Sequence, residues 1–260
     1  MNQMYNFLLT ILFFYISTAE SGDPLASSCN RDYTNNSQLS RNIDAFLPKL
    51  VQGAIQKGFL TTSYGNGANQ IYGLAQCRAD VSQSDCAACI KDAAKQSRKL
   101  CRPNQAGVSI WYDYCFLRYS TVEFFGQVDT SYAVFYWNVA NVTDPAVFNK
   151  KLGALVDKME SEAVKLPGSK GLGKAKTEVS PFETLYGLVQ CTRDLSPINC
   201  SQCLANAIGN FPIYCNDKKG CRVFYGSCYV RYELYPFFFP LESQGSSLVA
   251  NSAKYESFRP

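Results

Sequence analysis

The cysteines of this 260-residue chain recur in a pattern that constrains its organisation more than any other feature. Four of the twelve cysteines reappear 114 positions later, and a fifth reappears 113 positions later. The recurring pairs are Cys77 and Cys191, Cys86 and Cys200, Cys89 and Cys203, Cys101 and Cys215, and Cys115 and Cys228. Self-similarity at one period indicates two copies of a single structural unit. We therefore expect two tandem domains, at residues 27–124 and 133–240.

The segments around these cysteines repeat as well. Ile71–Cys77 reads IYGLAQC and its counterpart Leu185–Cys191 reads LYGLVQC. Phe116–Tyr119 reads FLRY, and Tyr229–Tyr232 reads YVRY. Both copies therefore place one predicted strand before the first shared cysteine and another after the last.

The N-terminus has the form of a secretory signal peptide over residues 1–19. Residues 8–16, LLTILFFYI, form a short apolar core, and Ser17-Thr18-Ala19 supplies the small residues of a cleavage site. An uncleaved signal anchor is the alternative, but the run is short for a membrane span of about 20 residues. We expect a chain without a membrane span that is secreted into the extracellular space (the apoplast), where cysteines oxidise.

Each predicted domain needs an even number of cysteines if all of them form internal disulfides. The five shared cysteines are completed by Cys29 in the first copy and by Cys221 in the second. If bridges stay within a domain, these two serve the same shared partner, and the short spacing favours Cys215–Cys221 and hence Cys29–Cys101. The other pairs stay open, because six cysteines allow 15 connectivities. Oxidation also argues against a zinc site, so we expect no metal and no cofactor.

Periodicity predicts a helix, a strand, a second helix and a hairpin in each copy. Apolar residues recur at helical spacing over residues 43–55 and 148–163, with Pro48 predicting a kink or break in the first of these helices. The second helices open at Ser84-Asp85 and Ser196-Pro197, and the hairpins span residues 108–119 and 222–235. Helices packed on one side of an antiparallel sheet make an α+β fold.

The spacing C-x8-C-x2-C, present twice, resembles the plant ginkbilobin-homology domain. Two such domains behind a signal peptide are similar to a cysteine-rich repeat secretory protein, and the resemblance covers about residues 27–240. It implies a disulfide-rich domain of two helices packed on a five-stranded antiparallel sheet, twice. The chain departs from the members of the family that span the membrane, because it ends in a Ser/Ala-rich segment, residues 243–260, which we expect to be a flexible tail. The resemblance also implies the pairs Cys77–Cys86, Cys89–Cys115 and Cys29–Cys101 and, by the repeat, Cys191–Cys200 and Cys203–Cys228.

The resemblance also suggests a carbohydrate site, because the single-domain ginkbilobin is a mannose-binding antifungal protein. Its polar trio is an Asn just after the first cysteine, an Arg six positions before the last and a Glu five positions after it. The first copy keeps the Asn but has serines, Ser109 and Ser120, at the other two positions. The second copy keeps the Arg and the Glu. The candidate carbohydrate-binding residues are Asn30, Asn138 (aligned through the helices), Arg222 and Glu233.

Strand alternation predicts where this Arg and Glu lie. If Gly226-Ser227 turns the hairpin, Arg222 faces Arg231, lies diagonal to Glu233, and shares with both a sheet face away from the helices. The alternate residues, from Val223 to Leu234, then pack against the helices. We expect Arg222, Arg231 and Glu233 to lie outside the core, as a sugar site or as an exposed cross-strand salt bridge without a ligand.

Composition narrows the function. The chain has no histidine, which excludes Ser-His-Asp and Cys-His catalysis, and nothing in the sequence pairs two carboxylates as acid and base. A net charge of +4 is too small to favour nucleic acid as a partner. Asn35 and Asn141 lie in glycan-acceptor motifs. We expect a secreted, non-enzymatic binding protein of plant defence or stress that recognises a mannose-type glycan or, alternatively, an extracellular protein; its oligomeric state stays open.

Overall fold

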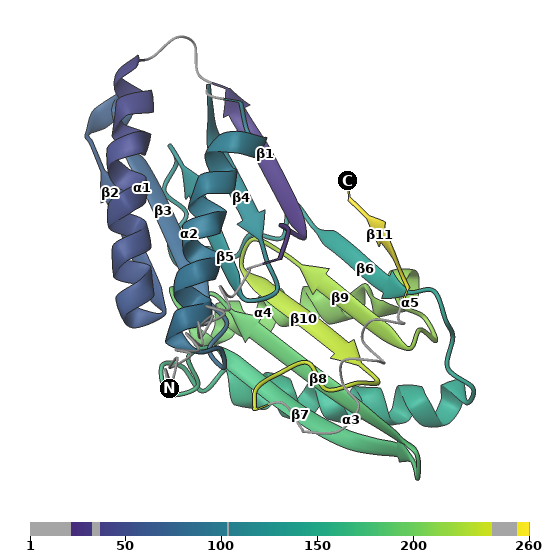
Figure 1. Ribbon diagram of the computed structural model, residues 1–260. Helices are drawn as coiled ribbons and strands as arrows, with labels where there is room; N and C mark the ends of the chain where they lie inside the picture. The colour runs from purple at the N-terminus through teal and green to yellow at the C-terminus, as the bar shows by residue number, and fades with distance from the viewer. Residues whose placement is uncertain (1–21, 33–36, 103, 241–253, 260) are drawn as a thin grey trace, which may run out of the picture.

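The computed structural model describes residues 22–32, 37–102, 104–240 and 254–259. The predicted signal peptide and Asn35 lie outside these residues. The chain forms two antiparallel sheets, each with helices on one face (Figure 1). The elements of the first half are β1 (Ala26–Asp32), α1 (Ser37–Lys57), β2 (Phe59–Tyr64), the 3-10 helix η1 (Gly67–Asn69), β3 (Ile71–Cys77), α2 (Gln83–Leu100), β4 (Gln105–Trp111) and β5 (Cys115–Ser120). The elements of the second half are β6 (Val134–Asn138), α3 (Pro145–Ala163), β7 (Leu172–Ser180), β8 (Glu183–Cys191), α4 (Pro197–Gly209), α5 (Phe211–Tyr214), β9 (Gly220–Phe224), β10 (Cys228–Glu233) and β11 (Tyr255–Phe258).

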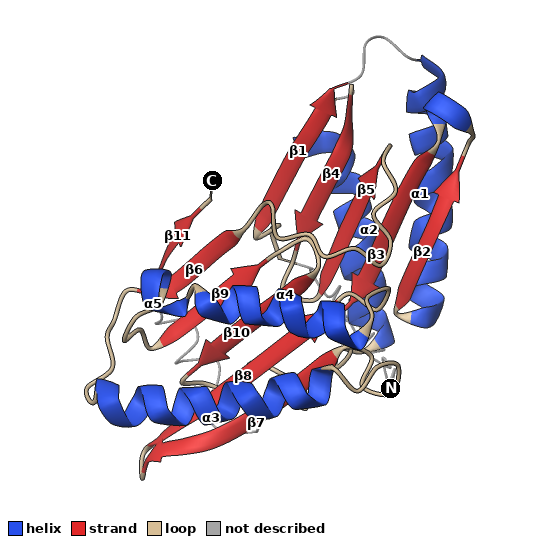
Figure 2. Ribbon diagram, turned by 180° about the vertical axis from the view of Figure 1, so that it is seen from behind, coloured by secondary structure: helices blue, strands red, loops and turns tan. Residues whose placement is uncertain are grey.

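The two halves have the same topology. The first sheet has the order β1-β4-β5-β3-β2, and the second has the matching order β6-β9-β10-β8-β7 with β11 added outside β6. Helices α1 and α2 cover the face of the first sheet that is seen in Figure 1, whereas α3 and α4 cover the opposite side of the second sheet, seen in Figure 2. The predicted α+β fold of two tandem disulfide-rich domains is confirmed, with a sixth strand in the second sheet.

The second helix of each domain begins where a serine caps it. The Ser82 hydroxyl accepts from the Asp85 amide at 3.1 Å, and the Ser196 hydroxyl accepts from the Asn199 amide at 3.2 Å. Pro197 follows as the first residue of α4, where a missing amide hydrogen costs nothing. The two helices therefore begin within about one residue of their predicted starts.

The break of the helix that Pro48 allowed is wrong. Helix α1 runs from Ser37 to Lys57 with Pro48 inside it. Pro48 and Asp44, one turn earlier, are both exposed, so water can take the place of the amide hydrogen that Pro48 cannot donate. The neighbouring Leu47 and Leu50 are buried, and their packing holds the helix on the sheet.

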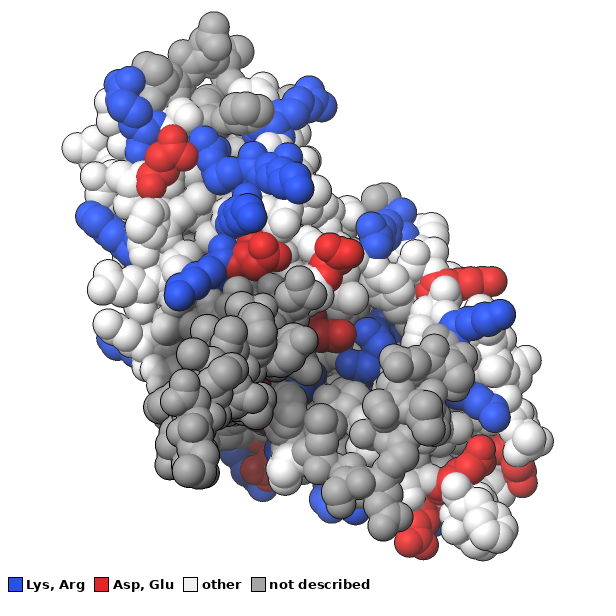
Figure 3. Space-filling view, viewed as in Figure 1, with Lys and Arg blue, Asp and Glu red and all other residues white. Residues whose placement is uncertain are grey.

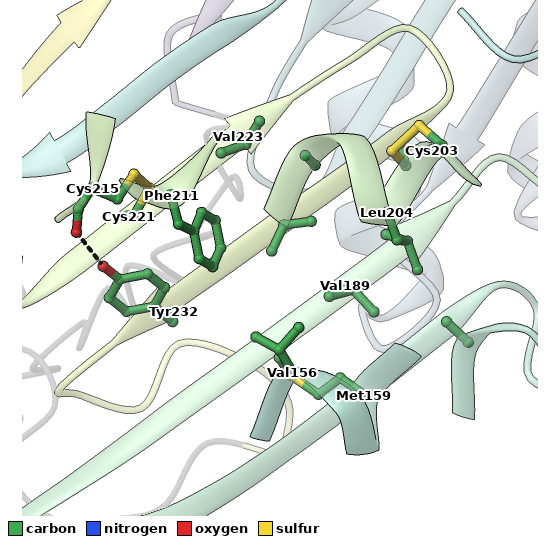
Figure 4. Close-up of a cluster of buried hydrophobic side chains, with 14 of the residues drawn as sticks. Val156, Met159, Val189, Cys203, Leu204, Phe211, Cys215, Cys221, Val223 and Tyr232 are labelled. Carbon is green, nitrogen blue, oxygen red and sulfur yellow. Dashed lines mark hydrogen bonds between the residues drawn. A yellow bond between two sulfur atoms is a disulfide. The ribbon is translucent and has the colours of Figure 1, made fainter. Parts of the chain in front are cut away.

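The core of the second domain lies between its sheet and its helices. Figure 4 shows Val156 and Met159 of α3 facing Val189 of β8, with Leu204 of α4 beside them. The Tyr232 hydroxyl, which lies inside this core, donates to the carbonyl of Cys215 at 3.1 Å. The alternation predicted for the hairpin holds on this face, where residues 223 to 234 contribute every second side chain.

Six disulfides close the two domains, and all of them stay within one domain. The pairs are Cys29–Cys101, Cys77–Cys86, Cys89–Cys115, Cys191–Cys200, Cys203–Cys228 and Cys215–Cys221. They are the same six pairs that the repeat and the family resemblance predicted.

The described part of the C-terminal segment is a strand, where the sequence predicted a flexible tail. β11 pairs antiparallel with β6, and Tyr255 lies opposite Asn138. Its residues alternate between the two faces of the sheet: Phe258 stacks on Tyr214 on the helical side, and Tyr255 points to the other side. A tetrapeptide strand in a Ser/Ala-rich region has too little apolar periodicity to be recognised from sequence.

Candidate site at the boundary between the domains

The polar trio assembles on one face of the second sheet. Arg222 of β9 pairs with Arg231 of β10, as predicted, and Glu233 lies two residues further along β10. Trp137 pairs with Cys221, which places Asn138 beside Gly220. Asn30 pairs with Gly107, the counterpart of Gly220, at the equivalent position of the first sheet. The alignment of Asn138 with Asn30 therefore agrees with the register of the strands.

Glu233 is the centre of a buried hydrogen-bond network. Its Oε1 accepts from the Nε of Arg231 at 2.9 Å and from the Nε of Arg222 at 3.2 Å. Its Oε2 accepts from the Tyr255 hydroxyl at 2.5 Å. The side chain of Glu233 is 0% exposed. Both carboxylate oxygens are thus occupied by groups of this chain.

The first domain supplies a second carboxylate to the same network. Asp113 lies in the turn between β4 and β5, and its Oδ1 accepts from Nη1 of Arg222 and from Nη1 of Arg231, each at 3.2 Å. The Tyr235 hydroxyl accepts from Nη2 of Arg231 at 3.1 Å. Figure 3 shows acidic and basic side chains together on this face, between the two domains. Two arginines and two carboxylates therefore balance one another across the boundary.

The expectation that Arg222, Arg231 and Glu233 lie outside the core is wrong. Alternation correctly placed them on the face away from the helices, but the side chain of Arg231 is 5% exposed and that of Arg222 is 13% exposed. The Asp113 turn and Tyr255 cover them. The exposed cross-strand salt bridge predicted as the alternative is instead a buried network joining two domains.

Charge and burial set the protonation states in this network. Burial acts to raise the pKa of Asp113, but the guanidiniums of Arg231, Arg222 and Arg78 outweigh it and hold that pKa below the usual value. Burial, together with the negative charge of Glu233, raises the pKa of Tyr255. Asp113 therefore stays ionised and Tyr255 stays a hydrogen-bond donor at any mild pH.

The boundary between the domains is reciprocal. The Gln76 side chain donates to the carbonyl of Cys191 at 2.9 Å and accepts from the amide of Arg193 at 2.9 Å. Gln190, the counterpart of Gln76, accepts from the amide of Ala79, the counterpart of Arg193, at 3.2 Å. The glutamine of each domain therefore contacts the equivalent backbone position of the other domain, as in an interface between two identical subunits.

The segments that follow the last hairpin strand of each half contact the other half in the same reciprocal way. The amide of Gly126, after β5, donates to Asp194 of the second domain at 2.8 Å. The amide of Phe239, after β10, donates to Asp80 of the first domain at 2.7 Å. Asp80 and Asp194 each follow the first shared cysteine by three residues. Each domain thus holds the trailing segment of the other.

A small apolar seam fills the boundary between these polar contacts. Ala26 and Trp111 of the first domain pack with Val134 and Phe224 of the second. The Trp111 Nε1 donates to the carbonyl of Tyr225 at 3.0 Å. Beside this seam lies a cavity of about 50 Å³, a volume that suits water rather than a sugar ring. The two domains are therefore packed against each other and leave no sugar-sized opening at this cavity.

Of the other predicted site residues, Asn138 shares the sheet face with the network, whereas Asn30 lies in the other sheet. Asn30 is exposed on β1 in the first sheet, so the structure does not bring it to Arg222 and Glu233. Asn138 is buried, and its Oδ1 accepts from the amide of Ala140 at 2.9 Å. Asn141, in the second glycan-acceptor motif, is exposed.

Sequence reasoning missed three members of the network: Asp113, Tyr235 and Tyr255. Asp113 has no signal in the repeat, since the corresponding position of the second copy is Gly226. Tyr255 lies 22 residues after Glu233, in a segment that was expected to be a tail. Tyr235 follows Arg231 and Glu233 at two-residue spacing, so strand alternation could have placed it on this face, whereas only knowledge of the packing could have identified Asp113 and Tyr255.

Within the described ranges, no cluster of three or more His, Cys, Asp or Glu side chains is arranged to hold a metal ion. In the same part of the chain, no helix has the length and apolar character needed to cross a membrane.

Known proteins with related sequences and folds agree with this architecture. Residues 27–122 and 137–235 both match the family described as salt stress response/antifungal. The chain is 52% identical to cysteine-rich repeat secretory protein 55 of Arabidopsis thaliana, over 89% of this chain and 90% of that protein. It is 41% identical to an antimicrobial ginkbilobin-2-like protein of Castanea crenata, over 87% of this chain and 94% of that protein.

A solved structure shares the tandem arrangement. The tandem DUF26 ectodomain of the Arabidopsis thaliana cysteine-rich receptor-like protein PDLP8 superposes with a TM-score of 0.71 at 31% identity. The match covers 81% of this chain and 97% of that ectodomain. Two family matches, relatives along most of the chain and a shared tandem fold lead to one conclusion: the chain belongs to the salt stress response/antifungal (DUF26) family and carries two of its domains.

Proposed function

We propose that this protein is a secreted, non-enzymatic binding protein of plant extracellular defence or stress responses, and that it recognises other proteins rather than sugars. Relatives named as secretory and antimicrobial proteins support the setting. The apoplast is the compartment that fits a predicted signal peptide and a fold closed by six disulfides. The absence of histidine from the sequence supports a role without acid–base catalysis of the common kinds.

One observation favours a protein partner over a sugar: both carboxylate oxygens of Glu233 already accept hydrogen bonds within the protein. A sugar hydroxyl bound at the trio would need a free carboxylate oxygen, and both oxygens of Glu233 already accept hydrogen bonds from Arg222, Arg231 and Tyr255. A sugar hydroxyl that displaced an arginine from Glu233 would break a buried ion pair, and one that displaced the Tyr255 hydroxyl would exchange one neutral donor for another and would also have to move β11. While Tyr255 is bound to Glu233, a partner therefore has to be recognised by the outer surface of the protein.

The packing of the two domains supports protein binding in a second way. Gln76 and Gln190 each form a hydrogen bond with the backbone of the other domain. A rigid body loses little conformational freedom on binding and can present a broad surface of the size that protein partners need.

Glycan binding is the second candidate, and one observation favours it. Asn138, Arg222 and Glu233 do lie together on one sheet face, at the positions that the family resemblance assigns to the mannose-binding trio. In this candidate function, Tyr255 would have to leave Glu233 before a sugar could bind.

A calorimetric titration of the mature protein with mannose, mannan and chitin oligosaccharides separates the two candidates. We expect no saturable heat at millimolar sugar. Saturable binding that is lost in Glu233→Gln and kept in Glu162→Gln, a variant at a half-exposed surface position, would overturn the preference for proteins.

Cross-linking of the tagged protein in extracellular wash fluid tests the protein partner directly. We expect a complex of defined stoichiometry that survives excess mannose and enzymatic removal of glycans. A complex that disappears on glycan removal would contradict protein recognition. Growth inhibition of a fungus by the purified protein tests the defence role separately, and its absence across several species would argue against a directly antifungal action.

A further inference from the structure

The sixth strand of the second sheet is an addition that the domain fold does not require. β11 lies outside β6, whereas β1, the counterpart of β6, carries no further strand among the described residues of the first domain. All six disulfides lie between Cys29 and Cys228, upstream of β11. The first domain thus shows that this sheet is complete with five strands.

One side of β11 inserts a tyrosine into the buried network. The Tyr255 hydroxyl donates to Oε2 of Glu233 at 2.5 Å and lies 2.8 Å from the Tyr235 hydroxyl. The guanidinium carbon of Arg222 lies 4.8 Å from the centre of the Tyr255 ring. We call Arg222, Glu233 and Tyr235 the tyrosine well. Gly220 leaves the space above Glu233 open, since a Cβ there would come within 2.0 Å of Oε2.

The other side chains of the segment are also recognised individually. Phe258 stacks on Tyr214, with ring centres 5.4 Å apart. Glu256 accepts from Nε1 of Trp137 at 3.1 Å. Arg259 donates to the carbonyl of Leu25 in the first domain at 2.7 Å. The segment is therefore held by a backbone ladder and by side chains on both faces of the sheet.

These contacts have the form of peptide recognition by strand addition, in which the main chain supplies affinity and pockets for alternate side chains supply specificity. We propose that the outer edge of β6 and the tyrosine well form a binding site for an extended peptide segment of another extracellular protein. The peptide carries a tyrosine, an aromatic residue three positions later and an arginine directly after that, and β11 fills the site in cis. This inference rests on the proposed function, because it names the chemistry of the protein partner.

Covalent attachment makes the internal segment a strong competitor. A tethered ligand acts at an effective concentration in about the millimolar range. A free peptide therefore binds measurably only when the anchors of β11 are weakened or when the segment is removed. Its displacement also uncovers Glu233 and Arg222 at the same time.

The test compares three proteins: the intact mature chain, the chain ending at Pro240, and the full-length double variant Tyr255→Ala/Phe258→Ala. The probe is the synthetic peptide of residues 254–259, Lys-Tyr-Glu-Ser-Phe-Arg, titrated by calorimetry. Tryptophan fluorescence gives a second readout, because Trp137 contacts the segment and Trp111, the other tryptophan, is buried in the seam between the domains.

We expect one-to-one saturable binding to the truncated chain and to the double variant, at least about tenfold tighter than to the intact chain. A scrambled peptide, and a peptide with alanine in place of its tyrosine and phenylalanine, should bind at least about tenfold more weakly. The proposal is overturned if neither modified protein binds the peptide while both keep native circular dichroism and six disulfides. It is also overturned if the scrambled peptide binds equally well.

Two other outcomes identify other occupants and would also refute the proposal. A stable dimer of the intact chain in light scattering would show that a second copy exchanges its strand. Saturable mannose binding by the truncated chain, without peptide binding, would show a masked sugar site and would contradict the proposed function as well. Failure of the peptide alone, with the cross-linked protein complex intact, would leave the proposed function standing.

Discussion

Gln76 and Gln190 stand at the same position of the two repeats and each bonds to the backbone of the other domain, but the two are not equally satisfied. Gln76 makes two bonds across the boundary, to Cys191 and Arg193. Gln190 makes one, to Ala79, and its Nε2 finds no partner within the described residues. The reciprocal interface is thus symmetric in its positions and asymmetric in its energetics.

The first prediction follows from this difference. Gln76→Leu keeps the side-chain volume but removes the partner of the buried Cys191 carbonyl and of the partly buried Arg193 amide, so we expect a loss of about 1–3 kcal/mol in the free energy of unfolding. Gln190→Leu removes one bond and one unpaired amide group, and should cost about 1 kcal/mol less. Urea unfolding with the disulfides intact measures both. An equal or larger loss for Gln190→Leu would contradict the larger contribution that we expect from Gln76.

Asp113 gives the second prediction. Its pKa lies below the ordinary value, so its contribution to stability is present above the pKa of the unfolded chain, about 4, and is lost as the pH falls through the folded pKa. Asp113→Asn should lower stability by about 1–3 kcal/mol at neutral pH, less than for a fully buried pair because the Asp113 side chain is 38% exposed. The variant should also show a shallower loss of stability below pH 4.

A matched control for Asp113→Asn is Asp44→Asn. Asp44 pairs with Arg98 at 3.0 Å, but its side chain is 60% exposed. Its substitution should change stability by less than about 0.5 kcal/mol. Similar losses of stability for the two variants would mean that the contact of Asp113 with Arg222 and Arg231 contributes no more than an exposed ion pair.

The third prediction compares the disulfides formed by Cys101 and by its counterpart in the second repeat, Cys215. Cys29–Cys101 spans 72 residues, whereas Cys215–Cys221 spans 6. Because a longer loop restricts the unfolded chain more, replacing both cysteines by serine should cost about 4 kcal/mol for the first bridge and about 2 kcal/mol for the second. Denaturant unfolding of the two double variants decides the order, and the reverse order would be inconsistent with the loop-entropy argument.

The fourth prediction tests the close approach at Gly220. A Cβ there would lie 2.0 Å from Oε2 of Glu233, so Gly220→Ala must displace the Glu233 carboxylate and should cost about 1–3 kcal/mol. Gly153→Ala is the control, because Gly153 lies on the exposed face of α3 with no atom within 4 Å. The control should stabilise the protein by about 0.5–1 kcal/mol. Thermal unfolding of both variants makes the comparison.

Much of this architecture could be predicted from the sequence because its signals are local or periodic. The cysteine repeat identified the tandem fold, and the second helices begin within about one residue of the starts predicted from Ser84-Asp85 and Ser196-Pro197. The cross-strand pairing of Arg222 with Arg231 followed from the length of the hairpin turn. Each of these features depends on residues that are close in sequence or repeated at a fixed spacing.

The burial of Arg222, Arg231 and Glu233 could not be predicted, because it depends on residues that are distant in sequence. Alternation shows which face of a sheet a side chain occupies, but it does not show what covers that face. Asp113 comes from the other domain and Tyr255 from beyond the second domain, and neither has a counterpart in the repeat. Tertiary packing therefore turned an expected surface pair into an interior one.

The reciprocal boundary also bears on how the two halves have been free to differ. Since each half carries the same docking positions, the molecule has the organisation of a homodimer whose subunits were joined into one polypeptide. Joining relaxes a constraint that a true homodimer obeys, under which every substitution appears on both sides. One copy of this pair carries an arginine, a glutamate and a further strand, whereas its sibling has two serines at the corresponding positions and no sixth strand among its described residues, and the shared contacts are found in both.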